Sequence, residues 1–178
     1  MNEQKNLPER KPTRLRGYDY SNEGAYFITI CTQGRKNILS HIVGDGALDV
    51  PQVALTKIGA TVEKYILSSC KMNGIVVESY VIMPNHVHMI IHVTDTFMTN
   101  ENLVTDNGTS KAPSPTNAAI PHFVSTFKRF CHIECGQKIF QRSYHDHIIR
   151  DSKGYDKIFD YIQNNPTRWQ EDCFYTAE

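Results

Sequence analysis

The sequence lacks a run of about 20 consecutive apolar residues, the length that a membrane-spanning helix requires. Its first residues are polar and charged, unlike the apolar centre of a secretory signal peptide. We therefore expect a cytoplasmic protein with no membrane partner. Net charge is lacking too, because 19 Lys and Arg residues balance 19 Asp and Glu residues. Any attraction for nucleic acid must then come from local basic patches.

Paired cysteines are also lacking. The five cysteines are an odd number at scattered spacings, which argues against a disulfide framework and favours reduced thiols. Cys131 and Cys135 lie four residues apart on a predicted helix. Without a second cysteine pair to complete a zinc site, we interpret both as helix-packing residues.

The length of 178 residues suits a single domain with a sizeable core, so we predict one domain over residues 1–178. Two appendages stand out from it. Residues 1–20 form a basic arm, and residues 94–119 form an insertion rich in Thr, Asn, Ser and Pro that has little apolar periodicity. We expect the insertion to be flexible.

The remaining segments alternate between strand-like and helix-like patterns. Alternating or β-branched segments predict strands at 25–32, 75–83, 86–93 and 139–150. Apolar residues at helical spacing predict helices at 53–69, 120–133 and from Asp151 or Ser152 to Pro166. The order predicts an α+β fold of the ferredoxin-like split βαβ type, an antiparallel sheet with two helices on one face and an extra C-terminal helix.

Two histidines begin the strand at 86–93. Side chains alternate along a strand, so His86, His88 and His92 share one face while apolar residues occupy the other. Two imidazoles at i and i+2 can ligate one metal ion, although a lone His-x-His pair is also compatible with a polar strand face. The spacing alone leaves both interpretations open.

The C-terminal helix carries a tyrosine at the margin of its apolar stripe. Tyr161 lies about 100° from the centre of that stripe, at about 100° of rotation per residue. Asn165 follows four residues later on the same side of the helix. The pair could supply a nucleophilic hydroxyl beside a further metal ligand, although such tyrosines usually only pack their rings.

Four blocks of the chain together resemble one family. The segment MPNHVHMIIHV matches the HUH motif (His, hydrophobic, His) of single-strand DNA endonucleases. With GYDYSNEGAYFITICT, FQRSYHDHIIRD and YIQNNPTRW, it resembles the REP-associated tyrosine transposases. The resemblance runs from near Arg14 to Trp169 and is interrupted by the insertion.

The resemblance implies a function and roles for specific residues. His86 and His88 match the metal-binding pair, Tyr161 matches the catalytic tyrosine, and Asn165 occupies the place of a further polar ligand. The implied activity is a metal-dependent single-stranded DNA endonuclease and strand transferase that acts on hairpin DNA through a 5′-phosphotyrosine intermediate. Mg²⁺ or Mn²⁺ is the implied cofactor, and the implied location is the cytoplasm, in association with the nucleoid.

Basic side chains near these blocks are candidate DNA contacts. They are Arg14, Arg16, Lys128, Arg129, Arg142 and Arg150. Related single-strand transposases include homodimers, whereas members of the REP-associated family can work as monomers, so the resemblance leaves the oligomeric state open.

Other interpretations remain. His145 and His147 form a second His-x-His pair that could be a rival metal site or face the same cleft, and no role follows for His92. HVHMIIH also resembles the histidine-triad nucleotide hydrolases, but Ile90 stands where these require a third histidine. The chief alternative function is a hairpin DNA-binding protein that has lost catalysis, which would bind DNA without cutting it.

Overall fold

The structure is a computed structural model that describes Tyr18, Tyr20 and residues 22–44, 50–68, 74–94 and 118–176. A four-stranded antiparallel sheet forms its centre. The strands are β1 (Gly24–Cys31), β4 (Ile75–Ile82), β5 (His86–Val93) and β6 (His145–Ile149), in the order β4-β5-β1-β6. This is the split βαβ arrangement that the sequence predicts.

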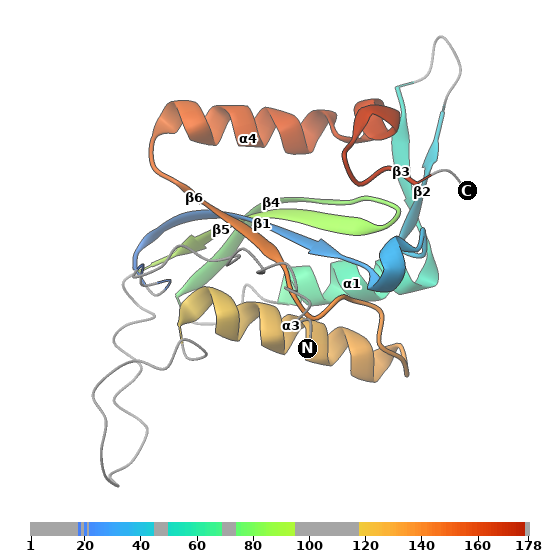
Figure 1. Cartoon of the computed structure of the whole chain (residues 1–178), viewed down its shortest axis with the longest axis horizontal. Helices are drawn as coiled ribbons and strands as arrows, with labels where there is room; N and C mark the ends of the chain where they lie inside the picture. Colours follow the sequence, from blue (N-terminus) through green and yellow to red (C-terminus); the bar gives the residue numbers. More distant parts are fainter. Residues whose placement is uncertain are drawn as a thin grey trace, which may run out of the picture.

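Three helices cover the two faces of this sheet. Helices α1 (Lys57–Ser68) and α3 (Ala119–Glu134) lie together on one face, and α4 (Ser152–Asn164) lies alone on the other (Figure 1). The predicted α+β class and the extra C-terminal helix are confirmed. Asp151 caps α4, because its side chain accepts a hydrogen bond from the Gly154 N–H at 2.7 Å.

The main core lies between the sheet and the pair α1 and α3. It takes the apolar face of β5, whose Val87, Met89, Ile91 and Val93 are all buried there. Phe123 and Phe127 of α3 pack into the same cluster. Burial of this face leaves the histidine face of β5 directed at α4.

A smaller core lies between the sheet and α4. Ile90 of β5 and Ile162 of α4 are both buried in it, and Ile158 packs against the cluster. This second core holds α4 on the sheet, and it therefore sets the distance between the residues of α4 and the histidines.

The structure corrects two of the predicted elements. A hairpin of β2 (Ser40–Val43) and β3 (Gln52–Leu55) was not predicted, and it takes the first residues of the helix predicted at 53–69. Helix α1 begins after Thr56, because the Thr56 hydroxyl accepts a hydrogen bond from the Gly59 N–H at 3.1 Å and so caps the helix.

The strand predicted at 139–150 is also too long. Only His145–Ile149 pairs as β6, and Phe140 makes an isolated bridge to Thr32. The described residues also form two short 3-10 helices, η1 (Gln33–Arg35) and η4 (Pro166–Glu171).

Several other predictions concern the N-terminal arm, the insertion, the cysteines and membrane helices. Nearly all of the basic arm and of the insertion at 94–119 lie outside the described residues. Among the cysteines that the structure describes, Cys31, Cys131, Cys135 and Cys173 are free, and Cys131 is buried in the main core, as predicted for a packing residue. No helix within the described ranges is both long and apolar enough to span a membrane.

A glycine in α1 allows a close backbone contact next to the turn that precedes His86. A Cβ added at Gly59 would collide with the carbonyl oxygen of Leu39, which also accepts hydrogen bonds from Thr56. The Leu39 N–H in turn donates to the carbonyl of Pro84 at 3.0 Å, in the turn before His86. Gly59 thus lets α1 fix the backbone that precedes the histidine strand.

We expect Gly59→Ala to destabilise the protein by about 1–3 kcal/mol, because the added methyl group overpacks this contact. Helix propensity alone predicts a gain of about 1 kcal/mol, so the sign of the change is diagnostic. Chemical denaturation measures it. The exposed neighbour provides the control, since Ala60→Gly should lose only the propensity difference. A raised midpoint for Gly59→Ala would contradict the close contact.

Candidate metal and nucleophile site

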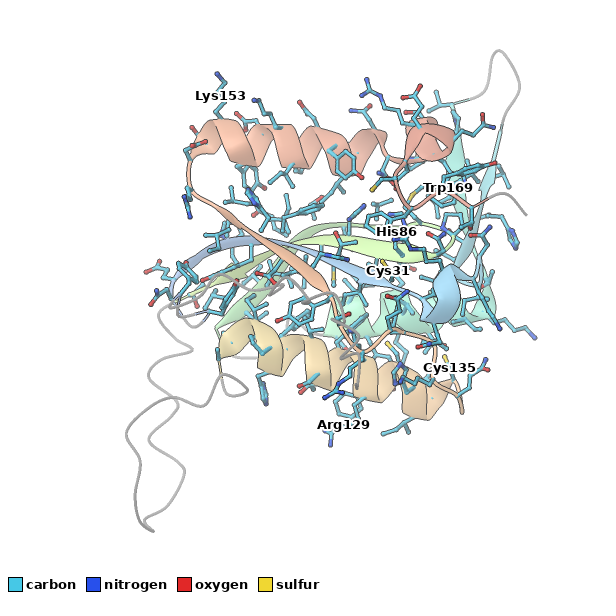
Figure 2. All side chains as sticks on the ribbon, in the orientation of Figure 1. Cys31, His86, Arg129, Cys135, Lys153 and Trp169 are labelled. Atoms are coloured by element: carbon cyan, nitrogen blue, oxygen red, sulfur yellow. The ribbon has the colours of Figure 1, made fainter. Side chains whose placement is uncertain are left out.

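The two histidines of the HUH motif are both buried, at the start of β5 and beneath the C-terminal segment. His86 is 0% exposed and His88 is 1% exposed, and their rings lie 4.3 Å apart between centroids. Figure 2 shows His86 on the side of the sheet that α4 covers, with Trp169 nearby. The structure thus brings the predicted pair into one enclosed site.

Asn85 determines which nitrogen of His86 is free. The Asn85 amide NH₂ donates to the Phe174 carbonyl at 2.8 Å and to the Thr176 hydroxyl at 3.1 Å, which directs its amide oxygen at Nδ1 of His86 at 2.9 Å. Nδ1 must therefore carry the proton and donate it. Nε2 is then an unprotonated lone pair, and it is buried with no hydrogen-bond partner among the described residues.

His88 joins the strand to the helix. Its Nδ1 lies 2.8 Å from the hydroxyl of Thr29, its neighbour on β1, and its Nε2 lies 3.3 Å from the hydroxyl of Tyr161. Its ring stacks on Phe27 at 5.0 Å between centroids. Both polar and apolar contacts therefore hold the imidazole in place.

Burial keeps both imidazoles neutral. Desolvation lowers the pKa of His86 to about 4, although the nearby Asp172 carboxylate acts in the opposite direction. Desolvation also lowers the pKa of His88 well below its usual value, and the neighbouring His86 adds to this effect. Neutral imidazole is the form that ligates metal ions.

Tyr161 of α4 directs its hydroxyl into the site. That hydroxyl donates to Oδ2 of Asp172 at 2.8 Å, while the side chain remains 40% exposed. Burial, followed by the hydrogen bond to Asp172, raises the tyrosine pKa above its usual value. The group is therefore a protonated phenol with an open side toward solvent.

Asp172 is the site residue that the sequence analysis missed. Burial raises the pKa of its carboxyl, but hydrogen bonds from the Phe174 N–H, the Asn165 amide and the Tyr161 hydroxyl outweigh burial and lower that pKa overall. The carboxylate is therefore ionised. No local pattern distinguishes Asp172 from the other acidic residues, because the turn after η4 brings it to the histidines.

Asn165, the predicted further ligand, lies at the edge of the same group. It is 2% exposed, and its NH₂ donates to Oδ2 of Asp172 at 3.0 Å. Its amide oxygen is buried without a hydrogen-bond partner in the described part of the chain. The ligand role therefore stays a prediction, with an uncompensated oxygen in its favour.

These residues fit a divalent metal ion. His86, His88 and Asp172 can each offer one ligand atom, and the three atoms lie within 4.8 Å of one another. Two neutral imidazoles and one carboxylate are a donor set that suits Mn²⁺ and related ions. The free lone pair on Nε2 of His86 and the free amide oxygen of Asn165 are both buried polar atoms that a bound ion would satisfy.

The chain has a sequence relative that matches nearly its whole length. No established family model matches it. An uncharacterized protein of Haemophilus influenzae (strain ATCC 51907 / DSM 11121 / KW20 / Rd) is 33% identical over 181 residues, which cover 95% of this chain and 94% of that protein. The two proteins belong to one family.

The fold also has a counterpart among solved structures. A REP-associated tyrosine transposase bound to a REP hairpin matches with a TM-score of 0.56 and 19% identity, over 88% of this chain and 73% of that chain. The chain has the fold of the REP-associated tyrosine transposases. The resemblance seen in the sequence blocks is therefore confirmed at the level of the fold.

On this transposase fold, the candidate DNA contacts separate into three groups. Arg14 and Arg16 lie outside the described residues. Lys128 is buried, and its ammonium group donates to the carbonyls of residues 141, 142 and 143, so it holds the loop before β6 and presents no charge to a ligand. Burial lowers the pKa of Lys128 to about 8.

Three predicted arginines are exposed. Arg129 lies on α3, across the sheet from the histidines, and its guanidinium stacks on Phe130 (Figure 2). Arg142 and Arg150 lie before and after β6, at an edge of the sheet. Arg150 follows Ile149, which pairs with Ala25 at the end of β1 remote from the partners of His86 and His88. Both arginines stay candidates for DNA contact.

The second His-x-His pair faces the same side of the sheet as the first. His145 pairs with Thr29, and His147 pairs with Phe27, so both share the face of His88. Both are exposed on the edge strand β6. His92 instead lies 2.6 Å from Glu78, outside the group around Asp172.

We expect Asn85→Ala to weaken Mn²⁺ binding by about 10- to 100-fold, since it removes the group that fixes the tautomer of His86. Isothermal titration calorimetry measures the affinity. Asn37→Ala is the matched control, because Asn37 also hydrogen-bonds Thr176 but does not contact His86. Equal losses in both variants would show that only anchoring of the C-terminal segment matters.

We expect the metal-free protein to become less stable as the pH is lowered. The folded-state pKa of His86 is about 4, below the unfolded value of 6.5, so the unfolded state binds the extra proton between these values. The contribution of His86 to the free energy of unfolding is fully present above about pH 6.5 and is lost as the pH falls. At pH 5 the loss is about 2 kcal/mol.

Urea unfolding in EDTA across pH 5–8 measures this dependence. His86→Gln should make the stability-pH profile shallower. His145→Gln, a change at an exposed histidine of the same face, should leave the profile as it is. An unchanged profile in His86→Gln would contradict the assignment of a buried neutral imidazole.

Proposed function

We propose that the protein is a metal-dependent single-stranded DNA endonuclease and strand transferase that acts on hairpin DNA through a 5′-phosphotyrosine intermediate. One observation carries the proposal. The hydroxyl of Tyr161 lies 3.3 Å from His88 and 2.8 Å from Asp172, within the group of residues that fits a metal ion. A nucleophile beside such a group is what phosphoryl transfer requires.

The chain's own residues supply the first step. The phenolic oxygen of Tyr161 attacks the phosphorus of the scissile phosphate while its proton passes to Asp172, which already accepts that proton in a hydrogen bond. The bond from phosphorus to the 3′-oxygen breaks, and the 3′-oxygen takes a proton from solvent. The products are a 5′-phosphotyrosine ester and a free 3′-hydroxyl. The ester retains the energy of the broken bond for rejoining.

Asp172 controls when this proton moves. The pKa of Tyr161 is raised and that of Asp172 is lowered, so in the resting site the proton stays on the phenol. Transfer becomes favourable only as the phenolic oxygen bonds to phosphorus and loses its basicity. The arrangement therefore keeps Tyr161 unreactive until a phosphate is in place.

His86, His88 and Asp172 would hold the ion, which is Mg²⁺ or Mn²⁺ in this proposal. Bound there, the ion would polarise a phosphate oxygen and stabilise the negative charge that develops in the transition state. An ionised carboxylate has about four lone-pair sites, so Asp172 can bind a cation and still accept the Tyr161 hydrogen bond.

Exposure of the nucleophile suits a large substrate. The side chain of Tyr161 is 40% exposed on the edge of α4, while the two histidines beneath it are buried. A DNA phosphate can thus approach from solvent without the fold opening. All of these groups come from one chain, which supports a site that needs no second copy.

Hairpin DNA is the proposed substrate class. The similar solved structure is of a REP-associated tyrosine transposase bound to a REP hairpin. Arg142, Arg150, His145 and His147 are exposed around β6, and we propose that they contact the DNA backbone. These residues could supply the local charge that the neutral chain lacks overall.

The test is a covalent adduct. We expect the protein, incubated with Mn²⁺ and hairpin oligonucleotides that have single-stranded flanks, to form a protein–DNA band that resists denaturation. Tyr161→Phe should give no band, and EDTA should abolish it in the wild type. Asp172→Asn should slow its formation by about 100-fold or more.

Tyr155→Phe is the matched control, because Tyr155 lies on the same helix but outside the site, and it should form the band normally. Hairpin binding with no band under any metal condition would instead favour the hairpin-binding protein without catalysis. A band that persists in Tyr161→Phe would refute the assigned nucleophile.

A further inference from the structure

A pocket of about 610 Å³ adjoins the site, between the β2–β3 hairpin and the C-terminal segment that follows α4. Its volume falls in the range of about 300–1,000 Å³ that is typical of ligand pockets. The residues that line it include His41, Pro84, Arg168, Trp169, Tyr175 and Thr176. The phosphotyrosine chemistry makes no use of this pocket.

Two aromatic side chains form a wall of the pocket. The rings of Trp169 and Tyr175 meet edge to face at 5.2 Å between centroids and an interplanar angle of 73°. Tyr175 is 39% exposed, so part of its ring surface is open to a ligand. Exposed aromatic surface inside a pocket is the platform on which single-stranded nucleic acids stack their bases.

The pocket borders the metal and nucleophile site. The indole ring of Trp169 lies 5.9 Å from the ring of His86, and Pro84, which lines the pocket, is two residues before that histidine. Asp172 lies between Trp169 and Tyr175 in the chain, and its N–H donates to the Trp169 carbonyl at 3.2 Å. One short segment therefore shapes both the pocket and the carboxylate.

Polar groups surround the aromatic wall. Arg168 contributes an exposed guanidinium, and His41 and Thr176 contribute side chains that can hydrogen-bond the edge of a base. Arginine beside an aromatic platform is the combination that binds a nucleotide through its phosphate and its base together.

We propose that this pocket binds one unstacked nucleobase of the single-stranded DNA substrate, next to the scissile phosphate, by stacking on Trp169 and Tyr175. The inference rests on the proposed function for the identity of the ligand. It adds a specificity site, because a base held there fixes the register of the strand relative to Tyr161.

The single tryptophan of the chain makes the pocket observable. We would titrate Tyr161→Phe protein in EDTA with a hairpin that carries a short single-stranded flank, so that no cleavage can occur. Trp169 fluorescence reports on the pocket, and anisotropy of a dye on the hairpin reports total binding. We expect saturable quenching that follows the anisotropy.

Variants then assign the contact. Tyr175→Ala should weaken binding by at least about fivefold, the lower end for loss of one base stacking on an aromatic. Phe130→Ala is the matched control, because Phe130 is 40% exposed on α3, across the sheet. Thermal unfolding of each variant checks that the fold is retained.

Abasic substitution identifies the base. Each nucleotide of the flank is replaced in turn by an abasic one. At one position, the replacement should weaken binding to the Tyr161→Phe protein by about as much as Tyr175→Ala does. The same replacement should not weaken binding further when the protein already carries Tyr175→Ala. Three results would overturn the proposal: binding without any change in Trp169 fluorescence, equal affinities for all abasic flanks, or no binding of the hairpin at all.

This experiment is independent of cleavage. Suppose that fluorescence quenching and base dependence are observed, but the protein with Tyr161 intact forms no covalent adduct. The proposal that the pocket binds a base would then stand, and the proposed nuclease activity would be refuted. An adduct whose formation ignores Tyr175→Ala and every abasic position would retain the nuclease and refute the pocket.

Discussion

The central position of β5 in the sheet is the constraint on which the site depends. Hydrogen bonds to β1 and β4 on both sides fix its register, and α1 and α3 bury its apolar face. His86 and His88 must then face α4, because side chains alternate along a strand. A shift of one residue would exchange the two faces, so the same pairing that forms the core also places the two candidate metal ligands.

Burial of polar groups on this face requires specific partners. Thr29 hydrogen-bonds His88, and Asn85 hydrogen-bonds His86, so each imidazole has one nitrogen satisfied by the protein and another directed at Asp172 or Tyr161. Unsatisfied buried groups are costly, and the free nitrogen of His86 is such a group. This unfavourable free energy arises at the atom where a bound cation would remove it.

The C-terminal segment connects the helix, the ligands and the adjoining pocket. After Pro166 the chain turns through η4, places Asp172 against the Tyr161 hydroxyl, and returns to hydrogen bonds with Asn85 through Phe174 and Thr176. The group that sets the tautomer of His86 thus also anchors the segment that carries the carboxylate. We therefore expect loss of the Asn85 side chain to disturb both the tautomer of His86 and the position of Asp172.

The sequence by itself determined the ferredoxin-like order of elements and the two faces of β5, because periodicity is a local property of the chain. Its resemblance to a known family singled out His86, His88 and Tyr161, and the structure brings these three side chains together. The sequence misplaced the start of α1 and missed the β2–β3 hairpin, since the pairing of Ser40–Val43 with Gln52–Leu55 replaces local helical preference. Only the tertiary structure decided that Lys128 is buried and that Asp172 completes the site. Those outcomes depend on contacts between residues far apart in the sequence, which no local pattern encodes.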